Sequence, residues 1–115
     1  MLLLLSRKWC NDMKIIKKLS KLIKEEISDS ICYAKMALKY KEDNKNLAAT
    51  FYTLSLDEAK HANLLHAEVV KVIEDYRKEH GEPPPSMLAV YDYLHEEQIK
   101  EMQKAKNYQT MFREG

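Results

Sequence analysis

Two short motifs in this 115-residue sequence pair a carboxylate with a histidine three residues later. Glu58 precedes His61, and Asp92 precedes His95. On a helix, residues three apart project from the same face, one turn from each other. A carboxylate oxygen and an imidazole nitrogen placed in this way can bind one metal ion together. The pattern therefore predicts a metal site, provided that facing helices supply further ligands.

Apolar residues recur at helical spacing over three segments, at about residues 13–41, 47–80 and 86–112. The chain holds only two glycines and three prolines, which leaves little room for the turns of an all-β fold. Lys, Glu, Leu and Ala are plentiful, as in helical proteins. The sequence predicts an all-α fold, an antiparallel helical hairpin followed by a third long helix.

The connections between these segments carry helix-ending signals. Asn44 or Asn46 is expected to cap the second helix, because asparagine side chains accept backbone N–H groups at that position. Gly81 is expected to end the same helix in a left-handed conformation. Residues 83–85 are all proline, which predicts a stiff elbow before the third helix.

Residues 1–12 precede the clear amphipathic pattern, which begins at Met13. We expect them to form a poorly ordered or peripheral appendage, and residues 13–115 to form a single domain. The apolar run at residues 1–5 is too short to span a bilayer. Its basic residues follow it, whereas a signal peptide carries them in front. We therefore expect a cytoplasmic protein without a membrane partner.

The charge and the cysteines exclude several classes of function. The net charge is +1, and acidic and basic residues are interspersed, so no basic patch suggests nucleic-acid binding. Cys10 and Cys32 have neither the spacing of a metal site nor that of a disulfide framework. They are expected to be free thiols in a reducing compartment.

The predicted metal ligands fall within apolar stripes. Glu26 lies at helical spacing from Leu19 and Leu22 in the first helix. Asp92 and His95 lie on the apolar face of the third. In the second helix, residues spaced by three and four predict the seam with a neighbouring helix. This predicted seam comprises Leu47, Phe51, Leu54, Glu58, His61, Leu65, Glu68 and Val72.

A dimetal site in a helical bundle uses a glutamate from each of two helices and a Glu-x-x-His pair from each of the other two. Glu26, Glu58 and His61 form half of that set. Three long helices also leave an apolar face without a partner. A homodimer, or a higher homo-oligomer, would complete the site and cover that face, so we predict self-association.

The chain resembles the ferritin-like superfamily, and within it the rubrerythrin-type helical hairpin. It also resembles encapsulated ferritins and small ferritin-like proteins of bacteria and phages. The similar stretch runs from Glu26 to about Tyr76. The residues that carry the resemblance are Glu26, Tyr33, Ala48-Ala49 and Asp57-Glu58-Ala59-Lys60-His61-Ala62.

This resemblance implies that Glu26, Glu58 and His61 bind metal, with iron as the expected ion and manganese or zinc as alternatives. It also implies that Tyr33 lies close to the site. The chain departs from a complete rubrerythrin-like domain in its third helix, where it has Asp92-x-x-His95, and in the absence of a fourth helix. It has no Cys-x-x-Cys pair for a second iron site.

Two functions stay open on the sequence alone. The first is a ferritin-like metal-binding protein, whose di-iron site could serve a ferroxidase or a peroxide-consuming oxidoreductase. The second is a non-catalytic structural or interaction module that binds no metal. In the second case, the residues of the two carboxylate–histidine pairs would form a buried polar network, with His95 donating to a core carbonyl or to Glu58.

Overall fold

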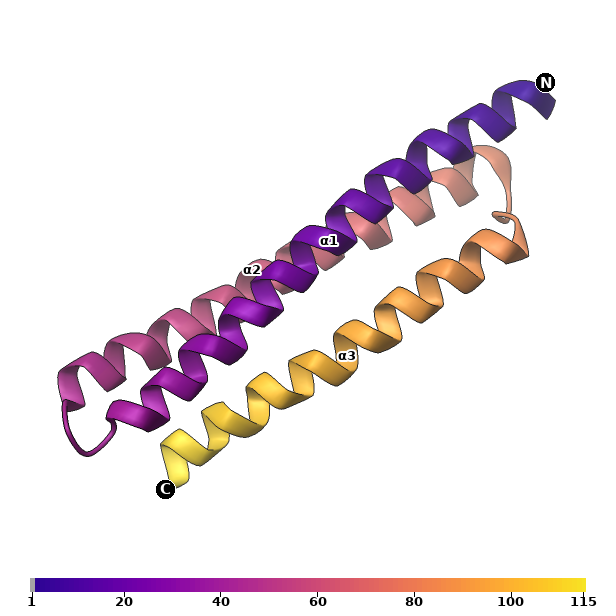
Figure 1. Cartoon of the computed structure of the whole chain (residues 1–115). Helices are drawn as coiled ribbons and strands as arrows, with labels where there is room; N and C mark the ends of the chain where they lie inside the picture. The colour runs from indigo at the N-terminus through magenta and orange to yellow at the C-terminus, as the bar shows by residue number, and fades with distance from the viewer. Residues whose placement is uncertain (1) are drawn as a thin grey trace.

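Three long α-helices account for nearly the whole chain (Figure 1). The computed structural model describes residues 2–115 and the side chains of residues 8–115. Helix α1 spans Leu2–Tyr40, α2 spans Lys45–His80 and α3 spans Pro85–Glu114. The described residues contain no strand, so the predicted all-α fold is confirmed.

The helices form an elongated bundle. α1 and α2 run antiparallel as a hairpin, and α3 runs back in the direction of α1 (Figure 1). α3 packs chiefly against α1 and only lightly against α2. The radius of gyration is 17.9 Å, whereas a compact domain of this length has about 13 Å. The rod therefore exposes more surface than a compact domain of the same length.

Helices α1 and α2 meet along a regular seven-residue repeat. Such a repeat keeps one face of each helix towards the other along their whole length. The repeat combines small and large residues, with alanine and serine near the α1–α2 turn and larger side chains towards the other end. The buried members are Trp9, Met13, Ile16, Ser20, Ile23, Ile27, Ser30, Ala34 and Ala37 in α1, and Ala48, Ser55, Ala62, Val69, Ile73 and Tyr76 in α2.

The seam predicted for α2 is wrong by one residue. The eight residues of the predicted seam, of which Leu47 is the first and Val72 the last, are half-buried or exposed. The buried positions follow one residue later, as Ala48, Ser55 and Ala62 illustrate. The cause is close helix approach: small side chains occupy the contact, while the larger apolar stripe lies on its flank.

The predicted helix ends agree with the structure. The Asn44 side chain accepts a hydrogen bond from the backbone N–H of Leu47 at 3.2 Å. Gly81 has a positive φ of 81°, and its N–H donates to the carbonyl of Arg77 at 3.0 Å. Pro85 opens α3, where proline's missing N–H removes no helical hydrogen bond.

The N-terminal prediction needs correction. α1 begins at Leu2 rather than Met13, and Trp9 and Asp12 are buried. Trp9 continues the seven-residue repeat, and the Asp12 carboxylate is paired with Lys8 at 3.3 Å. Trp9 and Asp12 therefore pack within the bundle, while Met1 and the side chains of residues 2–7 lie outside the described residues. No described helix contains a stretch apolar enough to cross a bilayer.

Replacement of Trp9 by alanine tests this extension of the core. The indole is 3 % exposed, and its ring lies edge-on to Tyr76 with 4.7 Å between centroids. We expect Trp9→Ala to lower the free energy of unfolding by about 3–5 kcal/mol in a urea titration. The matched control is Cys10→Ala at the exposed neighbouring position, which should change it little. Equal stabilities for the two variants would contradict this packing.

Candidate metal centre

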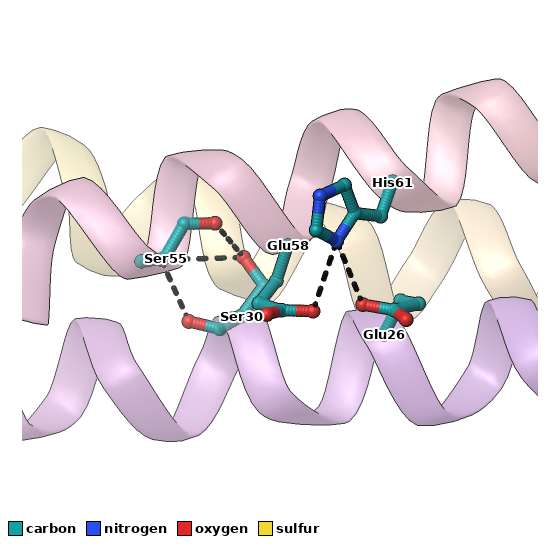
Figure 2. Close-up of polar contacts among 5 residues, drawn as sticks. All are labelled: Glu26, Ser30, Ser55, Glu58 and His61. Carbon is teal, nitrogen blue, oxygen red and sulfur yellow. Dashed lines mark hydrogen bonds and ion pairs between the residues drawn. The ribbon is translucent and has the colours of Figure 1, made fainter.

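Glu26 of α1 and Glu58 and His61 of α2 come together on one flank of the hairpin (Figure 2). One ligand atom from each lies within 4.8 Å of the others. His61 Nδ1 is 3.5 Å from Glu26 Oε2 and 3.5 Å from Glu58 Oε2. Among the described residues, no other group of three histidine, cysteine or acidic side chains converges in this way.

A buried polar layer fixes the register that brings these residues together. Ser30 Oγ donates to the carbonyl of Ser55 at 2.8 Å, and Ser55 Oγ donates to the carbonyl of Ser30 at 2.7 Å. Ser30 lies one turn beyond Glu26, and Ser55 lies one turn before Glu58 (Figure 2). The two reciprocal hydrogen bonds therefore align the helices next to the predicted ligands.

The third helix joins the same layer. Gln109 Nε2 donates to Ser55 Oγ at 2.9 Å and lies 3.4 Å from Ser30 Oγ. All three side chains are buried, and buried polar groups of this kind stabilise a fold when they are fully hydrogen-bonded. This layer was not predicted from the sequence. The sequence feature that could have revealed it is the position of Ser30 and Ser55 within the seven-residue repeats of the two helices.

The cluster lies at the edge of the seam, so the prediction that Glu58 and His61 lie within the seam is wrong. The side chain of His61 is 53 % exposed, compared with 28 % for Glu26 and 19 % for Glu58. Glu26 Oε2 is nevertheless buried and has no hydrogen-bond partner among the described residues. One wall of the cluster is thus protein, and the other opens to the surface.

Apolar side chains surround the open side of the cluster. Leu19 and Leu22 flank Glu26 along α1, and Leu54 and Leu65 flank Glu58 and His61 along α2. All four leucines are half-buried or exposed. α3 lies behind the hairpin in Figure 2, on the side away from the three ligands. This apolar flank is therefore uncovered in the single chain.

Tyr33, which the family resemblance places near the site, stacks on Phe51 with ring centroids 6.0 Å apart. It lies two helical turns beyond Glu26 on α1. The described contacts include no hydrogen bond between Tyr33 and the cluster. Its ring extends the aromatic and apolar character of the flank towards the α1–α2 turn.

The structure does not bring Asp92 and His95 to the cluster. Asp92 is exposed, whereas His95 stacks on His66 with ring centroids 4.5 Å apart. His95 Nδ1 is buried without a hydrogen-bond partner among the described residues. α3 turns Ala105 and Gln109 inward and packs on the opposite flank, so the second carboxylate–histidine pair is separated from the first. Among the described side chains, no hydrogen bond or ion pair joins the two pairs, so the predicted network between them is not formed.

His66 is half-buried where α2 meets α3. Its Nε2 atom lies 3.3 Å from the Tyr91 hydroxyl. Burial, and then the nearby His95, lower the pKa of His66 below its usual value of 6.5. Burial, and then the charge of Asp92, raise the pKa of Tyr91. Both rings are therefore neutral at pH 7.

A glutamate on one helix and a Glu-x-x-His pair on its antiparallel neighbour form half of a carboxylate–histidine metal centre, a type of site that defines a class of helical-bundle proteins. The rubrerythrin family model matches residues 17–114. The chain belongs to this family, which is part of the ferritin-like superfamily. Searches of the curated proteins and of the solved structures gave no match.

The stability of the α2–α3 contact should fall in mild acid. Folding lowers the pKa of His66 from its usual 6.5, so the unfolded chain binds the proton first as the pH falls. Neutral His66 makes its full contribution to the free energy of unfolding above pH 6.5. This contribution is lost as the pH falls through that value towards the lower pKa of His66 in the folded state. We expect His66→Phe, which keeps a ring and removes the charge, to reduce the loss of melting temperature between pH 7.5 and pH 5.5.

The matched control is His80→Phe at the exposed end of α2. This variant should retain the pH dependence of the unsubstituted protein, because His66 still titrates in it. A His66→Phe protein whose melting temperature falls as steeply as that of the control would contradict the assignment.

Proposed function

We propose that this protein binds iron through Glu26, Glu58 and His61, and that two copies form a di-iron centre at their interface. The observation that carries the proposal is the convergence of two carboxylates and one imidazole within 4.8 Å. Hard carboxylate oxygens together with imidazole nitrogen suit iron and manganese. Membership of the rubrerythrin family supports iron as the metal.

The residues present fit a cation. Glu26 Oε2 is buried without a hydrogen-bond donor, and a buried carboxylate oxygen is costly unless a positive charge or a donor compensates it. His61 Nδ1 lies 3.5 Å away, which is beyond a normal hydrogen bond. A metal ion would neutralise both carboxylates and accept the imidazole nitrogen, so it satisfies all three groups together.

The chain's own residues would hold the metal in complementary ways. Glu26 and Glu58 supply negative charge from two different helices, and His61 supplies a neutral nitrogen one turn from Glu58. Ser30 and Ser55 keep these helices in register at the adjacent turn. Bound iron would supply oxidation–reduction chemistry with oxygen or peroxide, which is the basis of the proposed ferroxidase or peroxide-consuming activity.

Three protein ligands are half of the set for a dimetal centre. A second copy related by a two-fold axis would supply the other half, because the same surface meets itself in such a dimer. The uncovered apolar flank with Leu19, Leu22, Leu54 and Leu65 supports this arrangement, since it surrounds the ligands and faces away from α3. Burial of that flank provides the driving force for association.

Metal analysis tests the ligand assignment. Protein purified after growth with iron should carry about one iron per chain, since a dimetal centre is shared by two chains. Glu26→Gln should lose most of this iron, because the amide removes a charge. Glu25→Gln changes the adjacent, exposed glutamate in the same way and should retain it. Equal iron contents in the two variants would contradict the assignment.

A charge placed on the apolar flank tests the dimer. Leu22 is 37 % exposed beside the cluster, and Leu64 is 68 % exposed elsewhere on α2. We expect Leu22→Asp to weaken dimerisation by about tenfold or more, because the dimer would bury an unpaired charge. Leu64→Asp should leave the mass measured by light scattering unchanged. A monomeric unsubstituted protein would contradict the proposal.

A structural module without metal is the second candidate. The layer of Ser30, Ser55 and Gln109 favours it, because these residues already join all three helices through satisfied hydrogen bonds. Such a module would need no ion for stability. A melting temperature that is unchanged by added ferrous iron and by chelators, together with an iron-free protein, would favour this second function.

A further inference from the structure

We propose that a groove between α1 and α3 binds a free medium-chain fatty acid. The groove has a volume of about 650 Å³, which lies within the range of small-molecule sites in proteins. Its lining residues come from α1 and α3, and none comes from α2. It is therefore a separate site from the Glu26, Glu58 and His61 cluster, and the inference goes beyond the proposed metal function.

Apolar and aromatic side chains contribute to the lining of the groove. They are Ile27 of α1 and Val90, Tyr93 and Leu94 of α3. Tyr93 is 65 % exposed and Val90 is 39 % exposed. An apolar surface that remains open in this way has a free-energy cost, which an acyl chain would relieve by displacing water.

The charges around the groove favour an anionic head group. Lys17, Lys21 and Lys24 follow one another along the α1 wall, and none forms an ion pair with another described residue. On the α3 wall, the carboxylates of Glu97 and Glu101 are each paired with a lysine of the same helix. Glu97 is paired with Lys100 at 3.5 Å, and Glu101 is paired with Lys104 at 2.8 Å.

The charge that has no partner in the groove is therefore positive, and apolar side chains line the same groove. A fatty acid matches both features, since its carboxylate would meet the lysines and its chain would cover Val90 and Leu94. The groove stays available in the proposed dimer, because its residues lie on the other side of α1 from Leu19 and Leu22. A volume of about 650 Å³ bounded by two helices suits a single acyl chain rather than a bilayer surface.

Calorimetric titration of the full-length protein with monomeric dodecanoate tests the proposal. We expect one dodecanoate per chain and weaker binding of dodecanol, which lacks the charge. The combined variant Lys17→Gln, Lys21→Gln and Lys24→Gln should bind dodecanoate about tenfold less tightly, since each exposed ion pair contributes modestly. The control, Lys18→Gln with Lys60→Gln and Lys71→Gln, removes the same charge from outside the groove and should bind normally.

Leu94→Trp provides a second test, because the larger side chain fills the groove without a change of charge. It should abolish dodecanoate binding while the helical circular dichroism and the iron content stay normal. Absence of dodecanoate binding to the unsubstituted protein would overturn the proposal. Equal dodecanoate affinities of the groove variant and the control lysine variant would also overturn it. So would a protein that sediments with phosphatidylglycerol vesicles but does not bind monomeric dodecanoate.

Discussion

The close approach of α1 and α2 is the constraint on which the rest of the structure depends. Ser30 and Ser55 each donate to the other's backbone carbonyl, and such bonds form only where two helix backbones lie close together. Alanines at neighbouring seam positions allow that approach. The contact sets the register of the hairpin, and the register places Glu26 opposite Glu58 and His61. Gln109 then attaches α3 to the same layer. The geometry of the candidate metal centre and the packing of all three helices therefore share one origin.

Each helix of the hairpin carries two adjacent stripes, one buried within the single chain and the other open to solvent. The buried stripe, with small residues near the α1–α2 turn and larger ones towards the other end, forms the hairpin seam. The neighbouring stripe combines leucines with the three metal-binding candidates and stays open to solvent in the single chain. Because α3 covers the other flank, this second stripe is the surface that a second hairpin would cover. Assembly and metal binding would then depend on the same residues, since the dimer that buries Leu22 also brings two ligand sets together.

Much of the fold follows from the sequence, because helical periodicity, the Asn44 cap and Gly81 depend on local interactions. Glu26, Glu58 and His61 could be predicted together, since one hairpin turn fixes their relative positions. The seam of α2 could not, because the leucine stripe is more hydrophobic than the serine and alanine stripe that makes the contact. Asp92 and His95 were misplaced for a different reason: the rotation of α3 about its axis depends on Gln109 and Ala105 packing against the hairpin, which periodicity does not determine. The helical start was also missed, since polar neighbours mask the continuation of the repeat at Trp9.

Anomalous diffraction at the iron absorption edge, from crystals of protein grown with iron, tests the central claim most directly. The account predicts a pair of anomalous peaks between two copies of the hairpin, each peak bordered by carboxylate oxygens of Glu26 and Glu58 and by the imidazole of His61. A single copy with no anomalous peak at these residues, or a peak bound at Asp92 and His95 instead, would contradict it.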